Sequence, residues 1–191
     1  MRFPDHSNGE NIIETYGKAE ILYKHGKKIM RFNKHTIGYD YDIEKYELIK
    51  DLFKGDVLNI GLGMGTSVNT ILNNPNVNSL IVYEIEEDII GLYNKLHTNE
   101  KLTIHNLNAF TNIPSGKFDC ILYELFIYNE EIYNKSINYI NLMKTHLKKD
   151  GIIVLEYNEY FLEIAKNYTY DIITNGKTGL GRRNQWIVIN N

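Results

Sequence analysis

The chain has 191 residues, which is enough for one domain with a sizeable hydrophobic core. Its formal net charge of −3 argues against a nucleic-acid partner. Its one cysteine, Cys120, lies in an apolar run, so the sequence has neither a disulfide framework nor a zinc-binding pattern. No apolar run is long enough to span a membrane and the first residues lack a signal-peptide core, so we expect a cytoplasmic protein with no metal site.

The first forty residues predict an N-terminal extension that carries a small β-hairpin. Residues 20–32 hold two β-prone runs, and the pair His25-Gly26 between them is typical of a tight turn. Residues 41–54 then place apolar side chains at helical spacing, which predicts a helix. We therefore separate an extension at 1–40 from the domain that follows.

The most informative segment is a buried strand that runs into a glycine-rich turn. Residues 56–60 form the strand, and Gly61, Gly63 and Gly65 follow it at the start of a helix predicted over 65–73. Glycines at a strand-to-helix turn let the backbone approach a ligand closely. This turn is the first candidate for a binding site.

A carboxylate follows this turn by about 20 residues, at the end of the next strand. That strand is predicted at 79–84, and Glu84 closes it. An acidic residue at this place is suited to accept hydrogen bonds from ribose hydroxyls. A dinucleotide fingerprint would need glycine or alanine where Thr66 stands. The pattern therefore favours a nucleoside ligand without a pyrophosphate.

Strands and helices alternate along the remainder of the chain. Further strands are expected at 102–107, 118–124 and 152–157, helices at 88–96, 130–147 and 159–167, and a terminal hairpin at 170–174 and 186–189 around a glycine-rich loop, 176–183. The alternation predicts a parallel sheet with helices on both faces, and two strands with no helix between them must run antiparallel. The fold predicted for residues 41–191 is α/β, with a Rossmann-like, seven-stranded, mostly parallel sheet and an antiparallel terminal hairpin.

Ligands of such sheets bind outside the carboxyl ends of the strands. That rule nominates Gly61 to Gly65 after the first strand, Glu84 after the second, Asn106 to Phe110 after the third and Glu124 to Ile127 after the fourth. Structural roles are the alternative at these positions. Glu124 would then cap the next helix, Asn108 would be a turn residue, and the aromatic side chains around Tyr123 would belong to the core.

Two segments resemble known enzyme families. The Gly-x-Gly-x-Gly spacing resembles motif I of class I S-adenosylmethionine-dependent enzymes, and residues 57–65 and 118–126 are similar to the corresponding motifs of guanidinoacetate methyltransferases. The segment Asn108-Ala-Phe110 is similar to an Asp-Ala-Phe sequence of spermidine synthases, which share the N-terminal hairpin. The resemblance covers about residues 20–158 and implies that the hairpin is a lid.

The resemblance implies the methyltransferase fold and S-adenosylmethionine as the cofactor. The three glycines would line its methionine and sulfonium part, Glu84 would hold its ribose, and Asn108 would face its adenine. The implied cofactor-binding residues are Gly61, Gly63, Gly65, Glu84, Asn108 and Ala109. Glu124 would lie near the transferred group and act as the catalytic residue by binding an amine.

Two departures from these families concern the acceptor. Arg31 stands where guanidinoacetate methyltransferases have a second acidic residue, so guanidinoacetate would meet a like charge. Ile127 stands where spermidine synthases have an aspartate, so putrescine would lose an anchor. We expect a small-molecule amine as substrate, with no nucleic-acid or membrane partner and with a homodimer as an open option.

The expected activity is transfer of a methyl group from S-adenosylmethionine to a small amine. Three alternatives stay open at this point. They are aminopropyl transfer as in spermidine synthase, breakdown of S-adenosylmethionine without an acceptor, and a non-catalytic nucleoside-binding module.

Overall fold

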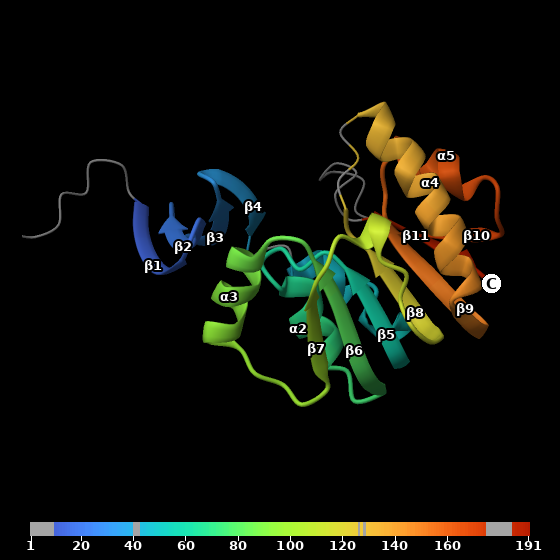
Figure 1. Cartoon of the computed structure of the whole chain (residues 1–191), viewed down its shortest axis with the longest axis horizontal. Helices are drawn as coiled ribbons and strands as arrows, with labels where there is room; N and C mark the ends of the chain where they lie inside the picture. The colour runs from blue at the N-terminus through green and yellow to red at the C-terminus, as the bar shows by residue number, and fades with distance from the viewer. Residues whose placement is uncertain (1–9, 40–42, 126, 128, 175–184) are drawn as a thin grey trace, which may run out of the picture.

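The structure, a computed structural model, describes residues 10–39, 43–125, 127, 129–174 and 185–191. A seven-stranded sheet carries helices on both faces, and a four-stranded antiparallel sheet lies at the N-terminal end (Figure 1). The predicted α/β fold is confirmed. Among the helices in these ranges, none is both long and apolar enough to cross a membrane.

The seven strands lie in the order β10-β11-β9-β8-β5-β6-β7. Their bounds are β5 Gly55–Ile60, β6 Val77–Glu84, β7 Leu102–Asn106, β8 Phe118–Tyr123, β9 Leu147–Glu156, β10 Tyr170–Thr174 and β11 Gln185–Asn190. Only β11 runs against its neighbours β9 and β10. The predicted terminal hairpin is therefore present, with its reversed strand between β9 and the edge strand β10; its loop, 176–183, lies outside the described residues.

The strand order places a binding crevice above β5. The chain proceeds outward from β5 to β6 and β7 on one side, and then returns to β8 and β9 on the other. Connections on the two sides leave the sheet in opposite directions, so the carboxyl ends of β5 and β8 form the topological switch point at which such sheets bind ligands.

Two cores cover the two faces of the sheet, and β8 contributes alternate side chains to each. Cys120 and Leu122 face the core formed with α2 (Thr66–Leu72) and α3 (Glu87–Leu96). Tyr123 faces the core formed with α4 (Glu130–Thr145) and α5 (Glu159–Ala165). Cys120 is fully buried as predicted, and this burial raises the pKa of its thiol, so it is an inert core residue.

The N-terminal sheet is larger than the predicted hairpin. Its strands are β1 Glu10–Tyr16, β2 Ala19–Lys24, β3 Lys27–Phe32 and β4 His35–Tyr39, paired in that order. The predicted hairpin is the central pair, β2 and β3, and its turn has φ of 51° at His25 and 75° at Gly26, as a two-residue turn of this kind requires. The outer strands were missed because neither alternates clearly between apolar and polar residues.

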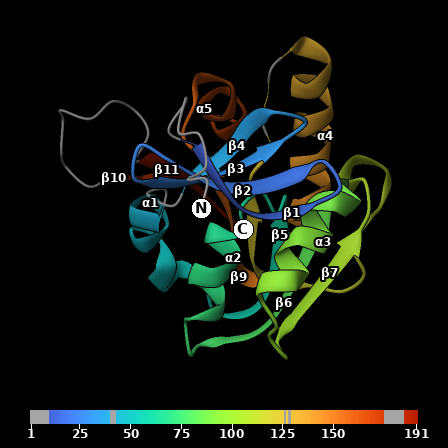
Figure 2. The same ribbon diagram turned by 90° about the vertical axis from the view of Figure 1, so that its left-hand side faces the viewer.

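This sheet packs on α3 and on the glycine turn (Figures 1 and 2). The backbone N–H of Lys18 donates to the carboxylate of Asp88 at 2.9 Å. A Cβ added to Gly38 of β4 would lie 2.9 Å from the Cβ of Met64, a separation that packed atoms do not tolerate. Glycine at position 38 thus lets β4 lie directly against the turn after β5.

The helix predicted over 41–54 is wrong in its length. The described part is a short helix, α1 (Ile43–Glu47), followed by a 3₁₀ turn, η2 (Lys50–Leu52). The buried side chain of Asn74 fixes this connection, because its Nδ2 donates to the carbonyls of Lys50 and Phe53 at 2.8 and 2.9 Å. Its Oδ1 accepts the N–H of Asn76 at 2.9 Å. The carbonyl of Lys50 also accepts the N–H of Phe53 at 3.2 Å, so Asn74 adds a second hydrogen bond to the 3₁₀ turn and ties it to the end of α2.

Replacing Asn74 by Ala should lower the free energy of unfolding by about 2–3 kcal/mol, since it removes three hydrogen bonds to the backbone in a buried place. Urea unfolding followed by circular dichroism measures the change. The matched control is the exposed neighbour Asn73, for which Ala should change stability by less than about 0.5 kcal/mol. Equal effects of the two substitutions would contradict this account of the connection.

Candidate active site

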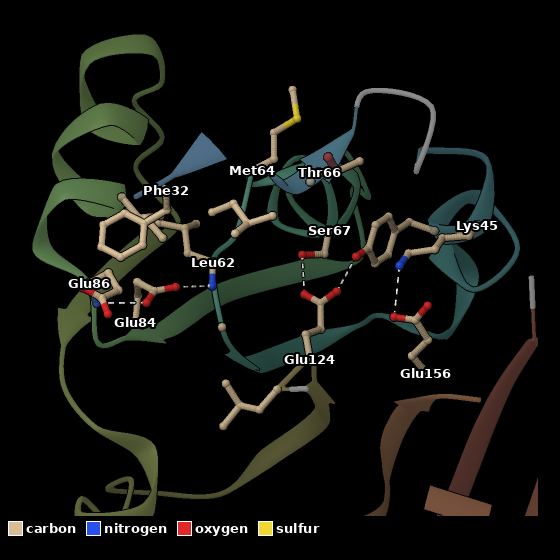
Figure 3. A pocket seen from close by; sticks show the side chains of 17 residues that line it. Phe32, Lys45, Leu62, Met64, Thr66, Ser67, Glu84, Glu86, Glu124 and Glu156 are labelled. Atoms are coloured by element: carbon tan, nitrogen blue, oxygen red, sulfur yellow. Dashed lines mark hydrogen bonds and ion pairs between the residues drawn. The ribbon is translucent and has the colours of Figure 1, made fainter. Parts of the chain in front are cut away.

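A cavity of about 280 Å³ lies at the carboxyl ends of β5, β6, β8 and β9, partly covered by β3 and β4 (Figure 3). The residues that line it are Phe32, Ile37, Gly38, Lys45, Tyr46, Gly61, Leu62, Gly63, Met64, Thr66, Ser67, Glu84, Glu86, Ile89, Glu124, Leu125 and Glu156. The sequence prediction of a site at these strand ends therefore coincides with a real cavity.

The glycines of the turn have different structural duties. A Cβ added to Gly63 would meet nothing within 4 Å, so the backbone there borders open space that a ligand can fill. A Cβ added to Gly65, the N-cap of α2, would lie 2.3 Å from the ring of Tyr93. Both residues have positive φ, 50° and 77°, which only glycine adopts at little cost. Gly61 and Gly63 line the cavity, whereas Gly65 shapes the turn from behind.

Glu84 holds the turns after β5 and β6 together. Its Oε2 accepts the backbone N–H of Leu62 at 2.9 Å, and its Oε1 accepts that of Glu86, also at 2.9 Å. The residue is 8% exposed and lines the cavity. Because each carboxylate oxygen can accept two hydrogen bonds, each has the capacity to accept one more.

The carboxylate of Glu124 is held by three side chains. Ser67 Oγ donates to its Oε2 at 2.6 Å, Asn59 Nδ2 donates to the same oxygen at 3.2 Å, and the Tyr46 hydroxyl donates to Oε1. Burial raises the pKa of the Glu124 carboxyl above its usual value, and the hydrogen bonds and the nearby charge of Lys45 offset part of that effect. The site therefore presents a rigidly oriented carboxylate in a poorly solvated place.

The alternative role of Glu124 as a helix cap is not the one observed. Asn129 caps α4 instead, because its Oδ1 accepts the N–H of Ile132 at 2.8 Å. By contrast, Tyr123 is a core residue: it is fully buried, and its hydroxyl is hydrogen-bonded to Ser136 at 2.8 Å. Its aromatic neighbours at positions 126 and 128 lie outside the described residues.

Asn108 and Ala109 lie at the same edge of the sheet but do not line this cavity. The Oδ1 of Asn108 accepts the N–H of Phe110 at 3.0 Å, so it caps the 3₁₀ turn η3 (Ala109–Thr111). Ala109 is buried within that turn. The turn role considered for Asn108 is therefore observed, and contact of the two residues with adenine stays a prediction.

Arg31 has a different environment from the one expected. Its guanidinium pairs with Glu10 at 2.9 Å and with Glu20 at 3.0 Å, both on the N-terminal sheet, and it does not line the cavity. Repulsion of a cationic acceptor by Arg31 is thus not supported. Ile127 also lies outside the lining, where it packs at the margin of the α4–α5 core.

Sequence reasoning missed the ion pair between Lys45 Nζ and Glu156 Oε2, 3.1 Å apart at the end of the cavity. Glu156 is the last residue of β9, so the same strand-end rule that nominated Glu124 would have found it. Lys45 carried no such signal, because its place in the cavity depends on how α1 packs against the sheet.

The sequence model of the guanidinoacetate N-methyltransferase family matches residues 6–174. The chain belongs to this family. Membership makes it a methyltransferase-like transferase, as we expected from the sequence. A spermidine synthase is also among the solved structures with a similar fold.

Three crystal structures show the fold. Spermidine synthase from Thermotoga maritima is similar with a TM-score of 0.70 and 14% identity, over 94% of this chain and 72% of that one. The N-methyltransferase NodS from Bradyrhizobium japonicum WM9 is similar with a TM-score of 0.60 and 14% identity, over 79% of this chain and 93% of that one. The complex of NodS with S-adenosyl-L-homocysteine has a TM-score of 0.59 and 14% identity, over 79% of this chain and 84% of that one. At such identities the likeness is one of fold.

Replacing Glu124 by Gln should increase the free energy of unfolding at alkaline pH. In the folded parent the raised pKa means that ionising this carboxyl costs free energy, whereas ionisation in the unfolded chain does not. As the pH falls through the raised pKa, the folded parent takes up a proton and gains stability. The advantage of the variant should therefore vanish below the ordinary pKa of a glutamate. Urea unfolding of parent and variant, from alkaline pH to below the ordinary pKa of a glutamate, measures this difference. A variant less stable than the parent at alkaline pH would contradict the raised pKa of Glu124.

Proposed function

We propose that this protein transfers the methyl group of S-adenosylmethionine to the nitrogen of a small amine. The observation that carries the proposal is the open space over Gly63, in a cavity that the carboxylates of Glu84 and Glu124 also line. Family membership supports the reaction class.

The residues present suit this cofactor. The backbone at Gly63 leaves room for the methionine part, and Glu84 keeps acceptor positions for two ribose hydroxyls. Of the charged residues that line the described cavity, four are glutamates and one is Lys45. Such a lining attracts a ligand with a positive sulfonium and ammonium. When bound, the cofactor supplies an electrophilic methyl group.

Glu124 is the proposed catalytic residue. Ser67, Asn59 and Tyr46 fix its carboxylate, so it can hold the acceptor nitrogen in one orientation without reorganising. The neutral amine uses its lone pair to take the methyl group from the sulfonium, and the carboxylate, in its poorly solvated place, stabilises the positive charge that builds on the nitrogen and can accept the proton that the product releases. The N-terminal extension, residues 1–40, would serve as the lid, because Phe32 and Ile37 line the cavity from above and can exclude water.

Aminopropyl transfer is the second candidate. The one lysine of the described lining, Lys45, is already paired with Glu156. Decarboxylated S-adenosylmethionine has no carboxylate that would need a cation, so it could bind without a further positive charge. Incubation with S-adenosylmethionine or its decarboxylated form, each with a panel of small amines, separates the two activities by the mass of the product. Loss of cofactor without a modified amine would indicate breakdown, and no turnover with either donor would indicate a binding module.

Titration calorimetry with S-adenosylhomocysteine tests the cofactor site. Gly63→Ala should weaken binding at least about tenfold, because its new methyl group would occupy the ligand space. Gly116→Ala is the matched control: Gly116 also has positive φ and nothing within 4 Å of an added Cβ, but it lies outside the cavity lining. Both variants should lose similar stability. Equal affinities of the two variants, or no binding by the parent, would overturn the cofactor assignment.

Glu124→Gln should reduce methyl transfer by about a hundredfold or more, since the amide keeps the shape but loses the charge that orients the amine. Affinity for S-adenosylhomocysteine should remain within about threefold of the parent, well under the tenfold that corresponds to 1.4 kcal/mol. Mass spectrometry of the methylated amine and calorimetry provide the two readouts. Full activity of the variant would remove Glu124 from the mechanism.

A further inference from the structure

One end of the cavity is built from charged and aromatic side chains that the proposed cofactor site does not use. Lys45 and Tyr46 come from α1, and Glu156 is the last residue of β9. Figure 3 shows Glu124 between this group and the end of the cavity at Glu84. If the proposed function holds, a donor over Gly63 leaves the Lys45–Glu156 end for the acceptor.

The ammonium of Lys45 lies in surroundings that suit alkylammonium ions in general. Its Nζ is 3.1 Å from Glu156 Oε2, 4.9 Å from the centre of the Tyr46 ring and 5.7 Å from that of Trp186. A carboxylate beside two aromatic rings attracts a cation through both the charge and the ring quadrupoles. We call this group, Tyr46, Glu156 and Trp186, the cation cage.

The cage does not depend on the position of the Lys45 side chain. Trp186 is fully buried, and its indole N–H donates to the backbone carbonyl of Lys45 at 2.9 Å. The hydroxyl of Tyr46 donates to the carboxylate of Glu124. Both rings are thus held by groups other than the lysine ammonium, so they would stay in place if that ammonium moved away.

The Lys45–Glu156 pair is of a kind that a competing cation can replace. The side chains are 13% and 31% exposed, respectively, and both line the cavity, so the pair is only partly buried and a ligand in the cavity can reach the carboxylate. Lysine carries a compact charge on a flexible four-carbon stem. Another ammonium at Glu156 would release Lys45 towards water and leave the carboxylate paired.

Charge balance explains why a lysine is present at all. Glu124 and Glu156 line the same part of the cavity, and two neighbouring carboxylates without a cation repel each other. A cationic acceptor would balance them in the way that Lys45 does in its absence.

We propose that the cation cage is the acceptor subsite, that Lys45 holds the place of an ammonium of the acceptor until the acceptor binds, and that Glu156 selects an acceptor bearing an alkylammonium group besides the neutral nitrogen that is methylated. Glu156 is then a specificity-determining residue, and Lys45 is an internal competitor of the substrate.

Butylammonium and butyrate are matched cationic and anionic probes of this subsite. Trp186 is the only tryptophan of the chain and its ring lies 5.7 Å from Lys45 Nζ, so its fluorescence should respond when that ammonium is displaced. Butylammonium should change this signal saturably, with about tenfold tighter binding in Lys45→Met and about tenfold weaker binding in Glu156→Gln. Butyrate should have no effect. Lys50→Met, which breaks an exposed pair with Glu47 nearby, should leave the affinity unchanged.

Opposite effects of the two substitutions distinguish an internal competitor from a merely structural ion pair, whose disruption from either side would shift affinity in the same direction. No tighter binding of butylammonium by Lys45→Met overturns the proposal, as does binding of butyrate that Lys45→Met abolishes. Lys45→Gln takes the place of Lys45→Met if circular dichroism shows the latter to be unfolded.

Titrations with and without S-adenosylhomocysteine separate the subsite from the proposed function. Binding of butylammonium by a protein that does not bind S-adenosylhomocysteine would defeat the proposed function and leave the subsite intact. The reverse result would defeat the subsite alone.

Discussion

The two hydrogen bonds accepted by Glu84 are the constraint on which the site depends. They join the N–H of Leu62, in the turn after β5, to that of Glu86, in the turn after β6. Both turns thereby take their positions from one carboxylate that is itself anchored in a buried strand. The open backbone at Gly63 and the start of α3 follow from this joint, and so does the place of Met64, against which β4 packs through Gly38.

Glu84 stabilises the structure, whereas the ionised carboxyl of Glu124 costs the folded state free energy. Its carboxyl lies where solvent is scarce, so its ionised form is disfavoured relative to water. The three donors around it reduce that cost and at the same time fix its direction. A residue kept for stability alone would be better served here by a neutral side chain. The arrangement is understandable when the carboxylate meets a cation.

The sequence was sufficient where the chemistry is local. Glycines with positive φ after a buried strand, and an acid at the end of the next strand, follow directly from the residues, and Gly63 and Glu84 lie where that reasoning placed them. Asn108 was nominated by the same rule, yet its side chain serves a local turn, because a short polar side chain readily bonds to a nearby backbone N–H.

What could not be predicted depends on contacts between distant segments. The helix expected over 41–54 ends at Glu47, and the 3₁₀ turn that follows it is held by Asn74, which lies far along the chain and binds the carbonyls of Lys50 and Phe53. The partners of Arg31 are set by the register of β1 and β2, which no pattern in β3 reveals. Likewise, Lys45 reaches Glu156 only because α1 packs beside the end of β9.

The position of β11 also has a consequence for the order in which the molecule assembles. This strand follows β10 in the chain, yet it lies between β9 and β10, so β10 cannot join the sheet until β11 has been inserted. Trp186 belongs to β11, and its indole N–H donates to the carbonyl of Lys45, which is 141 positions away in the sequence. The part of the cavity built from β5 and β6 therefore depends on segments made before β11, whereas the part that carries Lys45 and Glu156 is completed only once β11 has been inserted.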